Sequence, residues 1–190
     1  MIKINQITEY LNQSIAVKRS VIENNLEPIF ASIKMILAAL KGGNTIYIAG
    51  NGGSAADAQH WAAEFVGRFQ KERRALPVVA LTTNTSIITA IGNDYGFTKI
   101  FSRQIEAFAQ KGDVFIAVST SGNSDNLIEA LQVAKKSGVG TIALLGASGG
   151  NMKEMADISI IIDSPETCFI QEAHIAIEHL IVKLVEVEFV

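Results

Sequence analysis

Five short apolar runs recur along the chain, and the stretches between them carry helical patterns. The runs lie at 45–50, 77–82, 113–119, 141–146 and 157–163. Short, nearly continuous apolar runs are typical of strands that are buried on both faces of a sheet. Because strands that alternate with helices form parallel sheets, the pattern predicts an α/β fold with three α/β/α layers and a five-stranded parallel sheet.

The helical patterns show the spacing of amphipathic helices. Two of them, at 4–23 and from Pro28 to Lys41, precede the first strand, and the others are predicted at 54–67, 97–110, 123–137 and 167–189. A length of 190 residues suits one domain, and no linker or repeat divides the sequence. We therefore expect a single domain over 1–190, with the N-terminal helices (1–42) packed on it and available for contacts between subunits.

Charge and cysteine content exclude several classes of protein. The net charge is −3 and no basic stripe is present, so we expect no nucleic-acid partner. The first 14 residues mix charge into their apolar pattern, which is typical of neither a signal peptide nor a membrane span. The single cysteine, Cys168, allows no internal disulfide and suits a reducing compartment. A cytoplasmic protein without a membrane partner is therefore expected.

A hydroxyl-rich loop follows the third apolar run, directly before a helical pattern. Four hydroxyl residues fall within six positions there: Ser119, Thr120, Ser121 and Ser124. Free backbone N–H groups and the helix dipole favour an anion at a helix N-terminus, and the hydroxyls add further donors. An ordinary helix cap would need only one of them. Because the loop lacks the lysine of a triphosphate-binding loop, a phosphate monoester is the expected ligand.

A glycine-rich loop, Gly50-Asn51-Gly52-Gly53-Ser54-Ala55, follows the first apolar run. Its spacing matches a dinucleotide fingerprint, which also requires an acidic residue at the end of the second strand. The second run ends in Leu-Thr-Thr-Asn at 81–84, without a carboxylate. The alternative is that Asn51, Gly52 and Gly53 bring the backbone close to sugar hydroxyls.

Two helical segments carry a possible metal site. His60 and Glu64 are four residues apart and share one helix face, while Gln171 and His179 are eight apart on the last helix, about 80° around its axis. Nitrogen and oxygen ligands of this kind suit a divalent metal such as zinc. The alternative for His60 and Glu64 is a surface hydrogen bond.

Two further motifs have a structural and a functional interpretation. Asn93 and Asp94 lie in the turn-rich stretch 92–97, where they could contact sugar hydroxyls or serve turn formation alone. Arg68 follows the helix of His60, where it could contact substrate or cap the helix C-terminus.

Together these motifs resemble a known family. The combination comprises GNGGS (50–54), the helix with His60 and Glu64, GNDYGF (92–97), STSGNS (119–124) and the helix with Gln171 and His179. In order and spacing it resembles the phosphoheptose isomerases of the sugar isomerase (SIS) domain family, which have a flavodoxin-like fold. The resemblance covers nearly the whole chain.

The resemblance implies an activity and an assembly. The family converts sedoheptulose 7-phosphate to D-glycero-D-manno-heptose 7-phosphate through an enediol, the first step toward ADP-heptose for lipopolysaccharide or capsule. It implies a cytoplasmic homotetramer whose active sites lie at subunit interfaces. It also implies one zinc ion per subunit.

The resemblance also assigns roles to residues. The zinc ligands would be His60, Glu64, Gln171 and His179, and the acid/base pair would be Glu64 and His179. A carboxylate bound to zinc is a poorer base, so Glu64 would alternate between the two roles or serve mainly one. Substrate contacts would come from Asn51, Gly52, Gly53, Glu64, Asn93, Asp94, Ser119, Thr120, Ser121, Ser124 and Gln171.

Two rival functions remain open on the sequence. Some SIS proteins of this size are non-catalytic binding proteins, including a type that binds the bacterial replication initiator DnaA. These tend to lack the acid on the first helix and the histidine on the last, whereas this chain has Glu64 and His179. The other rival is an isomerase of a different sugar phosphate, because the phosphate loop does not report the length of the sugar.

Overall fold

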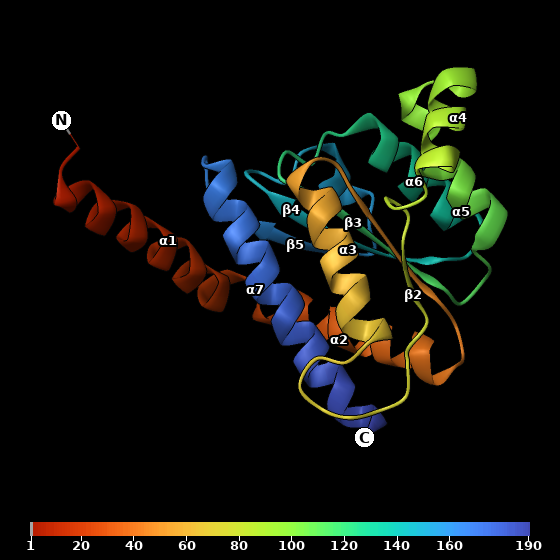
Figure 1. The fold of residues 1–190 in the computed structure, drawn as a ribbon, viewed down its shortest axis with the longest axis horizontal. Coiled ribbons are helices and arrows are strands. Elements are labelled where there is room, and N and C mark those ends of the chain that lie inside the picture. The colour runs from red at the N-terminus through yellow and green to blue at the C-terminus, as the bar shows by residue number, and fades with distance from the viewer. Residues whose placement is uncertain (1) are drawn as a thin grey trace.

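The fold is built on one parallel sheet, seen in a computed structural model that describes residues 2–190 (Figure 1). The strands follow the order β2-β1-β3-β4-β5, and every neighbouring pair is parallel. Their bounds are β1 Ile46–Gly50, β2 Val78–Ala80, β3 Val114–Ser119, β4 Gly140–Gly146 and β5 Ile158–Ile162. All five strands fall within the predicted apolar runs or within a residue of them.

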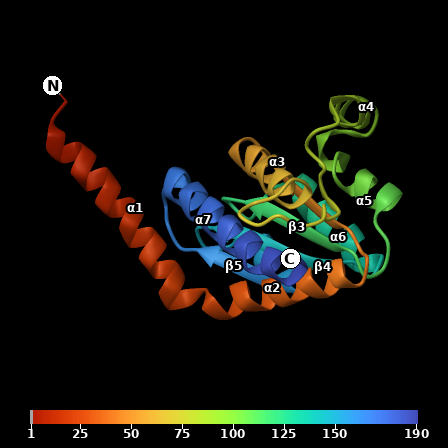
Figure 2. The same cartoon turned by 60° about the horizontal axis from the view of Figure 1, so that its bottom comes forward.

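Helices cover both faces of the sheet, so the predicted three-layer α/β/α fold is confirmed (Figure 2). One core lies under α2 (Leu26–Lys41), α3 (Gly53–Val66) and α7 (Thr167–Glu186), and the other under α5 (Ser102–Phe108) and α6 (Asp125–Lys136). Ile46 and Ile48 enter the first core, while Tyr47 and Ala49 enter the second. Because alternate residues of a strand point to opposite faces, a continuous apolar run serves both cores.

Helix α1 (Ile4–Asn24) projects from the body of the molecule as an arm (Figures 1 and 2). Lys18 ties the arm to α7 by an ion pair with Glu172 at 2.7 Å. The apolar residues that predicted this helix, Ile4, Ile7, Leu11 and Ile15, are all more than half exposed. Among the helices of residues 2–190, α1 included, none has the length and apolar character needed to cross a membrane.

The prediction of a loop at 92–97 and a helix at 97–110 was wrong in part. Residues 92–95 are the last turn of a helix, α4 (Thr85–Tyr95), which Asn84 caps by accepting a hydrogen bond from the Ile87 N–H at 3.0 Å. Gly96, with a φ of 88°, ends the helix. The chain then forms two short helices, η1 (Phe97–Lys99) and α5. The remaining short helices are η2 (Asn151–Glu154) and η3 (Val187–Phe189).

Candidate functional site

The glycine-rich and hydroxyl-rich loops meet at the carboxyl edge of the sheet. They follow β1 and β3, which are neighbours in register from Ile46 beside Val114 to Gly50 beside Val118. From β1 the chain passes to β2 on one side of β1, and it then returns to form β3 on the other side. In open parallel sheets this reversal of strand order opens the crevice in which ligands bind. A pocket of about 160 Å³ lies beside it, lined in part by Gly50, Asn51 and Gly52.

The hydroxyl-rich loop is held in a compact shape by its own side chains. The Oγ of Ser119 accepts a hydrogen bond from the Gly122 N–H at 3.1 Å and lies 3.2 Å from the Oγ of Ser124. The Oγ of Ser121 accepts from the Asn123 N–H at 3.2 Å, and Ser121 is exposed. Helix α6 begins at Asp125, directly after the loop. The hydroxyl donors thus lie next to a helix N-terminus, where an anion is favoured.

A second loop, which contains Gly149, packs against the hydroxyl-rich loop. Gly122 has a φ of 66°, and a Cβ there would lie 2.0 Å from the carbonyl oxygen of Gly149. The Gly122 carbonyl accepts a hydrogen bond from the Met152 N–H at 3.0 Å, and the Asn123 side chain accepts from the Asn151 N–H at 2.9 Å. Only glycine fits at 122, because the two loop backbones are in contact there.

The side chain of Asn51 is engaged within the protein. Its amide exchanges two hydrogen bonds of 2.9 Å with the amide of Asn126, which is buried in the first turn of α6. This reciprocal pair ties the glycine-rich loop to the helix that carries the hydroxyl-rich loop. The Asn51 amide thus has one donor and one acceptor already engaged within the protein. Sequence reasoning missed Asn126, which stands outside every motif.

Three possible metal ligands converge between α3 and α7. The Nε2 of His60 lies 3.0 Å from the Nε2 of His179 and 3.2 Å from a carboxylate oxygen of Glu64. One donor atom from each residue lies within 4.8 Å of the other two. The side chain of His60 is 45% exposed and that of Glu64 is 17% exposed, so the cluster can be reached from solvent. Such a set can bind a divalent cation or transfer protons.

Phe69 covers one side of this cluster. Its ring stacks on the ring of His179, with centroids 5.5 Å apart and planes inclined by 19°. The neighbouring Arg68, a candidate from the sequence, is 62% exposed and lies 3.9 Å from Glu72. Arg73, and not Arg68, donates hydrogen bonds to carbonyls at the end of α3. No role was predicted from the sequence for Phe69 or for Arg73.

Gln171 lies apart from this cluster within the chain. A Cβ on Gly53, at the start of α3, would come within 2.2 Å of the Gln171 side-chain nitrogen, so Gln171 packs over that glycine. Eight helical residues separate Gln171 from His179, which is about 12 Å along the axis of α7. The structure therefore places Gln171 beside the glycine-rich loop, together with Gly52 and Gly53, and not beside His60.

Asn93 and Asp94 are exposed on the last turn of α4. The Asn93 amide donates a hydrogen bond of 2.7 Å to the Asp94 carboxylate. Asp94 also lines a groove of about 260 Å³ between α4 and α5. Within residues 2–190, neither residue forms a hydrogen bond with the hydroxyl-rich loop.

Two ionisable side chains of α7 are buried within the protein. Glu178 and His174 are completely buried, and burial raises the pKa of Glu178 to about 8, with a further contribution from the charge of Asp57. Burial also lowers the pKa of His174 to about 4, against the hydrogen bond between its ring and the Leu145 carbonyl. Among the residues that the structure describes, neither Glu178 oxygen has a hydrogen-bond partner. Burial therefore favours a neutral acid at Glu178 and a neutral base at His174.

Comparisons with known proteins agree with this architecture. Residues 9–146 match the SIS domain family. The chain is 54% identical over 168 residues to a phosphoheptose isomerase of Aliarcobacter butzleri, covering 88% of this chain and 89% of the relative. It is 48% identical over 184 residues to one of Sulfurimonas denitrificans, covering 96% and 94%.

Solved structures give the same result. The phosphoheptose isomerase of Neisseria gonorrhoeae superposes with a TM-score of 0.90 at 40% identity, covering 96% of this chain and 97% of that one. That of Francisella tularensis superposes with a TM-score of 0.93 at 33% identity, covering 97% and 98%.

Proposed function

Because the chain belongs to the SIS domain family and, within it, to the phosphoheptose isomerases, we propose that it converts sedoheptulose 7-phosphate to D-glycero-D-manno-heptose 7-phosphate. The observation that carries the proposal is the convergence of His60, Glu64 and His179 at an accessible point. A protein that only binds a sugar phosphate has no need of an acid and two imidazoles at one position.

The chemistry requires one proton to move between neighbouring carbons. The ketose loses a proton from C1, an enediol forms, and a proton returns at C2 to give the aldose. We assign the proton transfer at carbon to Glu64, because a carboxylate can accept and return one proton. We assign proton exchange with the two oxygens to His179, whose ring can donate and accept. Each well-placed acid or base contributes about 10²–10⁴-fold to the rate.

The phosphate would bind at the hydroxyl-rich loop. Ser119, Thr120, Ser121 and Ser124 would donate hydrogen bonds together with the first N–H groups of α6. The backbone of Asn51, Gly52 and Gly53 and the amide of Gln171 would contact the sugar. Asn93 and Asp94, on the last turn of α4, stay proposed substrate contacts.

We propose one zinc ion per subunit at His60, Glu64 and His179. Two ligand atoms of a tetrahedral zinc ion lie about 3.3 Å apart when each bond is about 2.0–2.1 Å long. The 3.0 Å between the two histidine nitrogens and the 3.2 Å from His60 to Glu64 fit that spacing. A bound zinc would supply a Lewis acid for the developing oxyanion. Because the same chain's Gln171 lies about 12 Å along α7 from His179, Gln171 would have to join this set from a partner subunit.

The exposed arm supports a proposed homotetramer with active sites at subunit interfaces. Ile4, Ile7, Leu11 and Ile15 on α1 are between 54% and 83% exposed. A contiguous apolar helix face of this kind marks an interaction site in soluble proteins. On the resemblance alone, we propose that the reaction takes place in the cytoplasm and is the first step toward ADP-heptose.

The experiment that tests this function follows the reaction directly. The purified protein is incubated with sedoheptulose 7-phosphate, with a chelator and with zinc added back, and the aldose is followed by NMR. We expect turnover that falls with chelator and returns with zinc. Turnover that ignores the chelator would keep the isomerase and remove the metal from it. Binding without turnover would favour the non-catalytic alternative, and turnover of a different sugar phosphate would change the substrate.

A further inference from the structure

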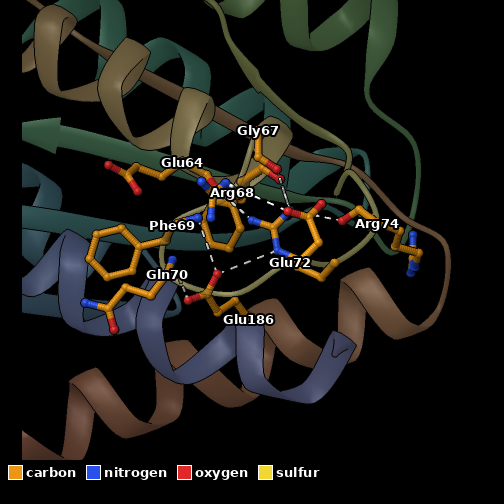
Figure 3. A network of polar contacts seen from close by, with 10 residues as sticks. Glu64, Gly67, Arg68, Phe69, Gln70, Glu72, Arg74 and Glu186 are labelled. Carbon is orange, nitrogen blue, oxygen red and sulfur yellow. Dashed lines mark hydrogen bonds and ion pairs between the residues drawn. The ribbon is translucent and has the colours of Figure 1, made fainter.

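The loop at 67–76, between α3 and β2, is fastened to the ends of both helices that carry the metal-ligand cluster (Figure 3). We propose that Arg73 and Glu186 form a buried brace that fixes this loop, holds the Glu64 end of α3 and seats Phe69 against His179. They would be positioning residues for the site. The inference deepens the proposed function and rests on it for its kinetic part only.

Arg73 binds the C-terminal end of α3. Its guanidinium donates hydrogen bonds to the carbonyls of Glu64 at 2.7 Å, Phe65 at 2.7 Å and Gly67 at 3.1 Å. The Arg73 side chain is completely buried. The last carbonyls of a helix have no partner within the helix, and a cation there is also favoured by the helix dipole. Because one of these carbonyls belongs to Glu64, Arg73 fixes the backbone of a proposed catalytic residue.

Glu186 binds the loop from the end of α7. Its carboxylate accepts hydrogen bonds from the N–H groups of Phe69 at 3.3 Å and Gln70 at 2.9 Å, and Figure 3 shows these residues beside it. The Glu186 side chain is 1% exposed, and one of its oxygens lies 4.0 Å from the Nε of Arg73. Each partner thus keeps the other from being an uncompensated buried charge.

The brace reaches the cluster through Phe69. Glu186 fixes the Phe69 backbone, and the Phe69 ring stacks on His179, which lies seven residues before Glu186 on α7. A side chain whose ring is covered on one face has fewer rotamers open to it. The brace therefore restrains Glu64 through Arg73 and His179 through Phe69. A displacement of about 1 Å in such groups can lower a rate by about 10²-fold.

The test uses the full-length protein with two variants and one control. Glu186→Gln removes the charge of the brace, and Phe69→Leu removes the stacked ring without touching a buried charge. Glu188→Gln is the matched control. Glu188 lies two residues after Glu186 and forms an exposed ion pair with Lys41. The readouts are kcat and KM for the sugar phosphate, and the ring signals of the three histidines in an NMR spectrum recorded without substrate.

We expect both test variants to lower kcat by about 10- to 100-fold with little change in KM, as for groups that act in the transition state. The His179 ring protons should move downfield, because they leave the shielding face of Phe69. His174, buried against Leu145, should keep its signals, and Glu188→Gln should leave all three in place.

Unmoved His179 signals in a folded Phe69→Leu protein would overturn the proposal, as would an unchanged kcat. If Glu186→Gln does not fold, Phe69→Leu still decides the contact to His179. The NMR readout needs no turnover, so it tests the brace even if the wild-type protein fails to isomerise this sugar. Failure of the proposed function and failure of the brace are therefore told apart.

Discussion

Asn51 and Asn126 hold each other through two hydrogen bonds of 2.9 Å, and together they join the two loops of the site. Each amide satisfies one donor and one acceptor of the other. We expect Asn126→Leu to lower the free energy of unfolding by about 1–3 kcal/mol, because it leaves the Asn51 amide without its partner.

The double variant Asn51→Leu with Asn126→Leu is the control for that prediction. Removing both amides leaves no orphan, so its cost should be smaller than the sum of the two single changes. Urea unfolding of the four proteins measures the coupling. Strict additivity would mean that the pair carries no mutual energy.

Ser121→Ala should weaken phosphate binding. The Ser121 side chain is exposed at the loop and accepts one local hydrogen bond, so its loss spares the fold. A hydrogen bond to a charged group contributes about 1.5–3 kcal/mol, which corresponds to an affinity loss of about tenfold or more. Calorimetry with the substrate measures it, with Ser137→Ala at the far end of α6 as the control. Equal affinities would argue against phosphate at this loop.

Glu64→Gln should lower kcat by at least about 10²-fold while substrate binding persists, because the amide cannot accept the proton from carbon. The matched control is Glu106→Gln, which changes an exposed acid on α5, on the opposite side of the sheet. Aldose formation followed by NMR gives the rate, and calorimetry gives the binding. Near-normal turnover would remove Glu64 from the proton transfer.

Glu178 should make stability fall as pH rises. Burial raises its pKa from 4.5 to about 8, so the unfolded chain releases this proton at a lower pH than the folded one does. The contribution is fully present below about pH 4.5 and is lost between there and about pH 8, at about 1.4 kcal/mol per pKa unit.

The variant Glu178→Gln isolates that contribution. It should lose less stability than the wild type when urea unfolding is compared at the two ends of this range. Glu154→Gln, an exposed acid, should behave as the wild type does. Parallel curves for Glu178→Gln and the wild type would show that Glu178 titrates normally.

Leu11→Glu should reduce the size of the assembly. Leu11 is 54% exposed on α1, so a charge there costs the isolated chain little but opposes burial against another subunit. Sedimentation velocity measures the outcome. Phe108→Glu, which changes a similarly exposed apolar residue on α5, is the control. A tetramer that survives Leu11→Glu would place the subunit contact elsewhere.

The sheet could be predicted because its signal is local. The three central strands, β1, β3 and β4, are buried on both faces, and a continuous apolar run such as TIYIAG indicates this without information from distant residues. Helix α4 could not be predicted in the same way. It buries no residue, and its sequence is rich in isoleucine and threonine, which are poor helix formers. The Asn84 cap was the one local sign of it.

The site was only partly predictable for a similar reason. His60 and Glu64 share a helix face, so their proximity follows from spacing alone. The other contacts join residues that are not neighbours in any pattern. Asn126 bonds to Asn51, 75 positions away, and Glu186 bonds to Gln70, 116 positions away. Arg73 bonds to Glu64, nine positions away. The position of Gln171 depends on how α3 and α7 are aligned, which no pattern within either helix encodes.

The parallel alignment of α3 and α7 also limits how the length of this chain can vary. Gln171 faces Gly53. Eight residues further along α7, His179 faces His60, which lies seven residues further along α3. Glu186 then faces the loop that begins after Val66. An insertion in one helix between these points would rotate every later residue of that helix about its axis and shift it along the axis. The residues that it contacts on the other helix would stay in place, so the contacts would be lost. Only a compensating insertion in the other helix would restore them. We would therefore expect relatives with an intact site to tolerate substitutions in this helix pair far better than gaps.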